Sequence, residues 1–146
     1  MSGLTGGCQC GAVRFSVERL GRASLCHCRM CQKAFGGFFG PLVDAHGLTW
    51  TKGGPSYFQS SNLARRGFCQ SCGTPLTFEL QGGPPNVAIG AFDDPAAITP
   101  AVQVGLEGKL PYVDHLADLP TLTSDEGARF AAHVAAVTSY QHPDHD

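Results

Sequence analysis

Apolar and polar residues alternate in two segments of the chain. Every second residue is apolar over residues 13–17 and again over residues 76–80, with polar side chains between them. A period of two is typical of a β-strand with one buried face, so we expect two strands with antiparallel neighbours. Shorter apolar segments give further strand candidates at residues 38–43, 48–51, 57–59, 87–91 and 102–106.

A helical pattern appears only near the end of the chain. Thr123 and Glu126 form a TxxE capping box, and Phe130, Val134 and Val137 follow on one helical face. This pattern predicts a helix over about residues 124–140, followed by a polar tail, QHPDHD, that we expect to fray. The 19 glycines and 10 prolines separate the strand candidates as turns. We therefore predict a mainly β protein with antiparallel sheets and a C-terminal helix.

Length and charge bound the possible functions. The 146 residues contain no repeat of fixed period and no long linker, so residues 1–146 are predicted to form a single domain. The net charge of -2 and the scattered basic residues favour neither a nucleic-acid partner nor a membrane surface. Residues 34–43 are too few to span a bilayer, and the first residues lack a signal pattern. We expect a cytoplasmic protein.

The seven cysteines are the most informative residues of the chain. An odd number cannot pair completely in disulfides within one chain, and a reducing cytoplasm keeps thiols free, so metal ligation is our interpretation. The cysteines form three motifs: CxC at Cys8 and Cys10, CHCxxC at Cys26, Cys28 and Cys31, and CxxC at Cys69 and Cys72.

Two of these motifs together predict a structural zinc site. In an extended strand, Cys8 and Cys10 project to the same side and can share an ion. Cys69 and Cys72, followed by Gly73, have the spacing of the tight turn in zinc knuckles. Four thiolates close the coordination shell of zinc, and structural zinc contributes on the order of 10 kcal/mol to folding. This exceeds the entropy cost of closing the loop between the two motifs.

The third motif predicts a site with an open position. We expect Cys26 and Cys28 to share one strand face and a turn to bring Cys31 beside them. Three protein ligands leave a tetrahedral zinc with one vacant position, as in catalytic sites. Because soft thiolate ligands suit a soft substrate, we expect a thiol to enter there. Spacing alone leaves open a purely structural second metal.

The histidines have weaker predictions. His27 lies between two cysteines and should point to the opposite face, where it packs or hydrogen-bonds behind the ligands. Its alternative role is to replace a sulfur as a ligand. His46, His115 and His133 are isolated in sequence, and we predict structural roles for them.

Two pairs of neighbouring charged residues have alternative interpretations. Asp93 and Asp94 precede a proline, and we predict that they form a turn rather than a catalytic pair. Arg65 and Arg66 precede the CxxC motif. An ion-pair or surface role is the simpler interpretation, and binding of a substrate carboxylate is the other.

Several segments together resemble the glutathione-dependent formaldehyde-activating enzyme family, over about residues 6–120. They are GGCQCGAVRF, LCHCRMCQKAFGG, YFQSSNLARRGFCQSCGTPL, IGAFDDP and KLPYVDHLADLP. The resemblance implies a β-tent fold with about two zinc ions per chain. It matches Cys8, Cys10, Cys69 and Cys72 to the structural zinc ligands, and Cys26, Cys28 and Cys31 to the catalytic ones.

The resemblance also implies an activity, the condensation of formaldehyde with glutathione to S-hydroxymethylglutathione. We therefore predict a zinc-dependent carbon–sulfur lyase acting on an adduct of an aldehyde with glutathione or another thiol. The alternative is a non-catalytic zinc-stabilised binding module, which needs only four cysteines. A methionine sulfoxide reductase is a weaker alternative, because it needs a reactive cysteine apart from the ligands, and none follows Cys72.

Overall fold

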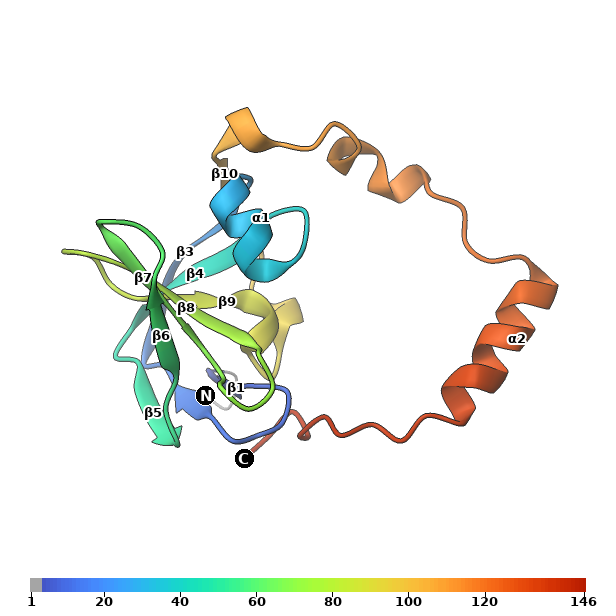
Figure 1. The fold of residues 1–146 in the computed structure, drawn as a ribbon, viewed down its shortest axis with the longest axis horizontal. Coiled ribbons are helices and arrows are strands. Elements are labelled where there is room, and N and C mark those ends of the chain that lie inside the picture. The colour runs from blue at the N-terminus through green and yellow to red at the C-terminus, as the bar shows by residue number, and fades with distance from the viewer. Residues whose placement is uncertain (1–3) are drawn as a thin grey trace.

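The strands of residues 4–146 form two β-sheets, shown in Figure 1. The structure is a computed structural model that describes these residues. Residues 1–3, where the sequence shows no signal pattern, lie outside the described residues. Within residues 4–146, no helix combines the length and the apolar character needed to cross a bilayer.

The smaller sheet has the strand order β1-β2-β5, and all its pairs are antiparallel. Its strands are β1 (Thr5–Gly7), β2 (Arg14–Ser16) and β5 (Thr49–Lys52). The larger sheet has the order β10-β3-β4-β9-β8-β7-β6. Its strands are β10 (Val102–Val104), β3 (Arg19–Cys26), β4 (Gly40–His46), β9 (Asn86–Ala88), β8 (Pro75–Leu80), β7 (Ala64–Phe68) and β6 (Ser56–Gln59). The larger sheet is antiparallel except for the parallel pair of β10 and β3.

The prediction of a mainly β protein is confirmed, and each predicted segment overlaps a strand. Strands β1, β3 and β7 were missed. Alternation is weak in β3, where the register shifts between Leu20 and Ala23. The alternation in β2 and β8 misleads at some positions: Arg14 and Thr77 are buried at 5% and 3% exposure, whereas Leu80 is 47% exposed. Ion pairing explains the burial of Arg14.

The hydrophobic core contains side chains of both sheets. Phe15 of β2 is fully buried and makes edge-to-face contacts with Trp50 and Phe92, at ring-centroid distances of 6.0 and 5.1 Å. Leu76 and Val87 of the larger sheet belong to the same buried cluster. Each large apolar side chain buried in this way contributes about 1.5–3 kcal/mol.

Helix α1 (Arg29–Phe35) was not predicted, because a helix of two turns shows little periodicity. The Cys28 side chain caps its first turn, and Gly36 ends it in the left-handed conformation at φ +63°. Residues 4–146 also contain 3₁₀ segments at Ile89–Ala91, Pro95–Ala97, Leu106–Gly108 and Val113–Asp118.

Helix α2 (Ser124–Ala135) confirms the predicted C-terminal helix and its capping box, although it ends five residues early. Figure 1 shows it apart from the sheets, and Phe130 and Val134 are at least half exposed. The chain then returns to the sheets. His142 donates its backbone N–H to Gln9 at 2.7 Å, and Asp146 bonds to Arg14. The prediction that the whole tail frays is therefore wrong, because polar contacts hold its end.

Candidate functional site

The structure brings the cysteines together in two separate clusters. The ligand atoms within each cluster all lie within 4.8 Å of one another. The first cluster contains Cys8, Cys10, Cys69 and Cys72, and the second contains Cys26, Cys28 and Cys31. These are the groups that the motif spacing predicted.

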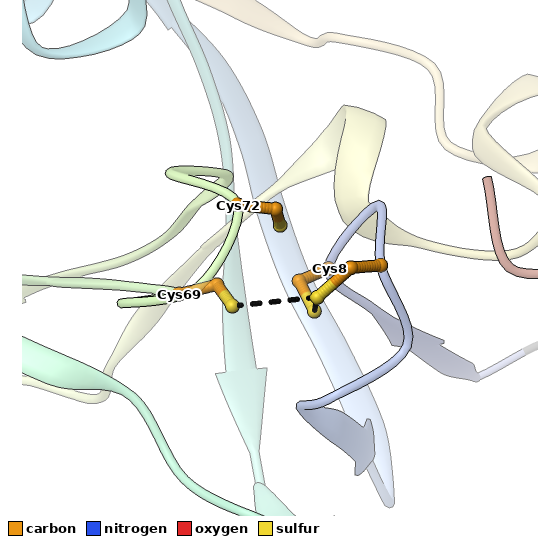
Figure 2. A group of neighbouring side chains, drawn as sticks. Cys8, Cys69 and Cys72 are labelled. Carbon is orange, nitrogen blue, oxygen red and sulfur yellow. Dashed lines mark hydrogen bonds between the residues drawn. The ribbon is translucent and has the colours of Figure 1, made fainter. Parts of the chain in front are cut away.

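Two turns supply the first cluster. Cys8 directly follows β1, and a turn closed by the Gly11 N–H to the Cys8 carbonyl at 3.2 Å carries Cys10. The predicted extended strand at Cys8 and Cys10 is therefore wrong, since a turn aligns these sulfurs. The second turn joins β7 to β8, and Figure 2 shows Cys69 and Cys72 facing Cys8 from it.

The sulfur geometry of the first cluster fits a tetrahedral ion. The Sγ atoms of Cys8 and Cys10 are 3.6 Å apart, and those of Cys10 and Cys69 are 3.8 Å apart. Zinc with Zn–S bonds of about 2.3 Å requires sulfur separations of about 3.8 Å. The four thiols therefore form a donor set suited to zinc.

Hydrogen bonds distribute charge unevenly in this cluster. Burial raises the pKa of the Cys72 thiol, but the Thr74 side chain and backbone N–H lower it more, to about 6. The backbone N–H of Ala12 lowers the pKa of Cys10, yet hydrogen bonding with the Cys8 thiol and other neighbours brings it to about 11. Cys72 therefore ionises at a lower pH than Cys10.

The second cluster lies where β3 ends and α1 begins. Cys26 is the last residue of β3, Cys28 caps α1, and Cys31 is in its first turn. The Sγ atoms of Cys26 and Cys28 are 3.4 Å apart. The expectation that Cys26 and Cys28 share a strand face is wrong, because the strand stops at Cys26.

The start of α1 favours a thiolate at Cys28. Burial raises its pKa, but the backbone N–H groups of Cys31 and Met30 and the neighbouring thiols bring it below the ordinary value. The Cys31 N–H donates to Cys28 Sγ at 3.4 Å. In contrast, the pKa of Cys26 is raised to about 12, and burial is the main cause.

The segment after β10 packs against this cluster, a contact that no local pattern in the sequence predicts. Gly105 has φ +66°, and a Cβ atom there would lie 2.9 Å from the Cys28 nitrogen and 3.4 Å from Cys26 Sγ. The Gln32 side-chain amide links the two segments by donating to the carbonyls of His27 at 2.8 Å and Gly108 at 2.7 Å. A glycine at position 105 therefore allows the close approach.

Arg66 was singled out in the sequence, but its place was not predicted. It is 4% exposed, and its Nη2 lies 3.4 Å from Cys31 Sγ. Arg65 faces the other way, 3.8 Å over the Tyr57 ring and 3.4 Å from a Glu79 carboxylate oxygen. Successive side chains of a strand point to opposite faces of the sheet, so a predicted strand at β7 would have placed the two arginines on different faces.

The remaining candidates lie outside both clusters. His27 is fully buried, and its Nε2 is 2.8 Å from Gln103 Oε1, as expected for a residue that supports the ligands. It does not join the three sulfurs as a metal-ligand candidate. The same holds for the isolated histidines His46, His115 and His133.

The two aspartates have different surroundings. The Asp93 carboxylate accepts two hydrogen bonds from Arg14, at 2.9 and 2.7 Å, and one from Thr5 at 2.6 Å. Hydrogen bonding from Arg14 holds the pKa of Asp93 below its usual value. Asp94 is exposed and directly precedes the 3₁₀ segment Pro95–Ala97. They therefore do not act as a catalytic pair.

Two hollows lie beside α1. The larger, of about 470 Å³, is lined by Arg29, Met30, Lys33, Ala34, Phe58 and Ser60. The smaller, of about 200 Å³, shares Ala34 and Phe58 with it and also includes Arg66. A ligand beside α1 would therefore contact the helix that carries Cys31.

Comparisons with known proteins identify a shared fold and a family. A crystal structure of a Rhodobacter sphaeroides protein superposes with a TM-score of 0.56 at 23% identity, covering 68% of this chain and 99% of that one. This similarity shows a shared fold. The family model described as glutathione-dependent formaldehyde-activating enzyme matches residues 3–107, which include all seven cysteines. The chain belongs to the glutathione-dependent formaldehyde-activating enzyme family.

Proposed function

We propose that this protein is a cytoplasmic zinc-dependent carbon–sulfur lyase acting on an adduct of a thiol with an aldehyde. Glutathione is the leading thiol and formaldehyde the leading aldehyde, as the family description suggests. The observation that carries the proposal is the second cluster, because Cys26, Cys28 and Cys31 stand apart from a complete set of four thiols. A purely structural role needs only the four.

The two donor sets suit different tasks. Four thiols complete a tetrahedral shell and leave no position for a substrate, so we assign Cys8, Cys10, Cys69 and Cys72 to a structural zinc. Cys26, Cys28 and Cys31 would hold the other. When bound there, zinc supplies an open position for an entering thiol and lowers the pKa of that thiol.

The chain's own residues keep the three sulfurs in place. The Cys31 N–H holds Cys28 at the start of α1. His27 and Gln32 fix the connection between β3 and α1 through Gln103 and the carbonyl of Gly108. Such a fixed donor set would orient a bound thiol for its reaction with an aldehyde, which lowers the entropy cost of the reacting step.

The larger hollow beside α1 supports a substrate of the size and charge of glutathione. Its volume of about 470 Å³ lies within the range of roughly 300–1,000 Å³ of small-molecule sites. Arg29 and Lys33 supply positive charge for the carboxylates of glutathione, and Met30 and Phe58 supply apolar surface. The residues of this hollow therefore complement an anionic peptide thiol.

Metal counting and cobalt spectroscopy test the proposal. We expect about two zinc ions per chain, because seven thiols divide into two donor sets. With cobalt in place of zinc, glutathione should change the absorption spectrum, whereas S-methylglutathione, which cannot form a thiolate, should not. The exchange of formaldehyde with its glutathione adduct should then be faster than the uncatalysed rate.

The outcomes separate the substrate from the class of function. If the cobalt spectrum changes with another thiol but not with glutathione, the proposed lyase class is supported and glutathione is excluded as the substrate. If no thiol changes the spectrum and exchange is not accelerated, the non-catalytic binding module is the better interpretation.

A further inference from the structure

Arg66 is a buried cation whose contacts point to the three-cysteine cluster. It lies in the middle of β7, between Phe58 of β6 and Phe78 of β8 in the sheet register. Its guanidinium carbon is 4.8 Å from the centre of the Phe78 ring, and the residue is 4% exposed. A cation in such a place is costly unless an anion or polar groups surround it.

The contacts of the guanidinium leave one nitrogen without a partner. Nε donates to Ser60 Oγ at 2.9 Å, and Nη2 donates to Cys31 Sγ at 3.4 Å. Nη1 is buried and has no hydrogen-bond partner. Within residues 4–146, no carboxylate forms an ion pair with Arg66. The Cys31 sulfur, which would be a thiolate when it binds a metal, is therefore the group in contact with Arg66 that can balance its charge.

The charges of the two groups match. Three thiolates around a divalent ion carry one net negative charge, and the guanidinium carries one positive charge. Arg66 also lines the smaller cavity of about 200 Å³, together with Phe35, Phe58 and Thr77. This cavity has room for a small oxygen-bearing group beside the Arg66 side chain.

We propose that Arg66 compensates the charge of the three-cysteine centre through Nη2 and binds the anionic oxygen of the thiol–aldehyde adduct through Nη1. The second part rests on the proposed lyase function. Hydrogen-bond donors aimed at a developing oxyanion in a site that excludes water are among the strongest contributions to catalysis.

The reaction step balances with Arg66 protonated throughout. In condensation, the thiolate sulfur attacks the carbonyl carbon, a C–S bond forms, and the π electron pair of C=O moves to oxygen. The resulting alkoxide accepts a hydrogen bond from Nη1 and then takes from water the proton that the thiol released when it formed its thiolate. In cleavage, the hydroxyl proton returns to water, C=O re-forms, and the sulfur leaves with the C–S electron pair.

Arg65 provides a matched control for the test. It is the adjacent residue on the same strand, it faces away from the cluster, and its partners are Tyr57 and Glu79. Arg66→Met, Arg66→Lys and Arg65→Met are to be compared with the unmodified protein, with circular dichroism to verify folding. Arg66→Lys keeps the charge but loses the planar fork of donors.

The first measurement is the affinity of the three-cysteine centre for cobalt or zinc. Without the Arg66 guanidinium, formation of the anionic complex of the metal with three thiolates is less favourable at a given pH. We expect Arg66→Met to weaken the second metal site by roughly tenfold or more, the effect of a lost group behind the ligands. Arg66→Lys should recover part of the affinity, and Arg65→Met should leave it unchanged.

The second measurement is turnover at saturating metal. Arg66→Met should lower kcat about 100-fold, as removal of an oxyanion donor does, with little change in the KM for glutathione. Added guanidinium should partly restore kcat in Arg66→Ala, whereas a merely structural loss would not respond. Arg65→Met should retain full activity.

The two possible failures are distinguishable. If the unmodified, metal-loaded protein accelerates no thiol–aldehyde exchange, the lyase proposal fails and the alkoxide role of Arg66 fails with it. If Arg66→Met retains the metal affinity of the unmodified protein, charge compensation is refuted even in an active enzyme. An unchanged kcat in Arg66→Met would overturn the oxyanion role.

Discussion

The four-cysteine cluster and the three-cysteine cluster differ in how far apart in the sequence their cysteines lie. The first joins turns far apart in the chain, with Cys10 and Cys69 separated by 59 positions. The second gathers three sulfurs from the short segment between Cys26 and Cys31. An ion in the first cluster connects distant parts of the fold, whereas an ion in the second restrains only a local segment. We therefore expect metal binding to be coupled to folding mainly at the first cluster.

The surroundings strengthen this contrast. Cys8 and Cys69 belong to the main hydrophobic core cluster, and both are at most 4% exposed. The second cluster lies beside two hollows and a buried arginine. Under the proposed function, the first cluster stabilises the fold and the second is the reactive site. Substitutions at different places should therefore lower the free energy of unfolding by different amounts, from the largest effect at the first cluster to the smallest at the second.

Cys69→Ser should have the largest effect. A hydroxyl is a poor zinc ligand, and structural zinc contributes about 10 kcal/mol or more, comparable with the 5–15 kcal/mol of a whole domain. We expect the variant to lose its native circular dichroism and its cooperative thermal transition. A variant that retains the melting temperature of the unmodified protein would refute the structural role of the first cluster.

Asp93→Asn should have the next largest effect. Asp93 accepts two hydrogen bonds from Arg14, whose side chain is 5% exposed, in the region that also contains Cys8. Removing one partner of a buried ion pair costs about 3 kcal/mol. Urea unfolding measures the loss, and Asp94→Asn, at an exposed neighbour, serves as the control. Equal effects of the two substitutions would contradict the assignment.

The stability that Asp93 contributes should depend on pH. Arg14 lowers the pKa of Asp93 in the folded state, so the contribution is fully present above the unfolded value of about 3.9. It should be lost as the pH falls through the lower folded value. The unfolding free-energy difference between the unmodified protein and Asp93→Asn should therefore be constant near neutral pH and shrink below about pH 4. A constant difference down to pH 2 would exclude this linkage.

Gly73→Ala should have a smaller effect. Gly73 has φ +81° in the turn after Cys72, and its N–H bonds to the Cys69 carbonyl at 2.8 Å. A Cβ there would meet no atom within 4 Å, so only backbone strain of about 1 kcal/mol is expected. Gly54→Ala, where space is also open and φ is not in this region, should be nearly neutral. The difference in melting temperature between the two variants is the measurement.

Cys28→Ser should have the smallest effect on unfolding. Only the second cluster depends on Cys28, so the protein should remain folded while it loses about one metal ion and its carbon–sulfur chemistry. Metal analysis and thermal melting of the same sample measure both effects. If this variant unfolds as extensively as Cys69→Ser, the division of labour between the clusters is wrong.

Particular residues show how far sequence reasoning reached. The grouping of the cysteines and the start of α2 at Ser124 were correct, because motif spacing and a capping box depend on residues near in sequence. Helix α1 was missed because its seven residues are shorter than the window in which helical periodicity is detectable. The backbone at Cys8 and Cys10 was wrong because strand and turn can both place two sulfurs together.

The sequence by itself determined which cysteines group into each cluster, the mainly β class of the fold and the family. These follow from local spacing and side-chain chemistry, which do not depend on how the strands pair. Only the tertiary structure decided that Arg14 is buried against Asp93, that Gly105 approaches Cys28, and that Arg66 rather than Arg65 reaches Cys31. Each of these contacts joins residues more than 30 positions apart. Its existence depends on strand order and register, which local patterns do not specify.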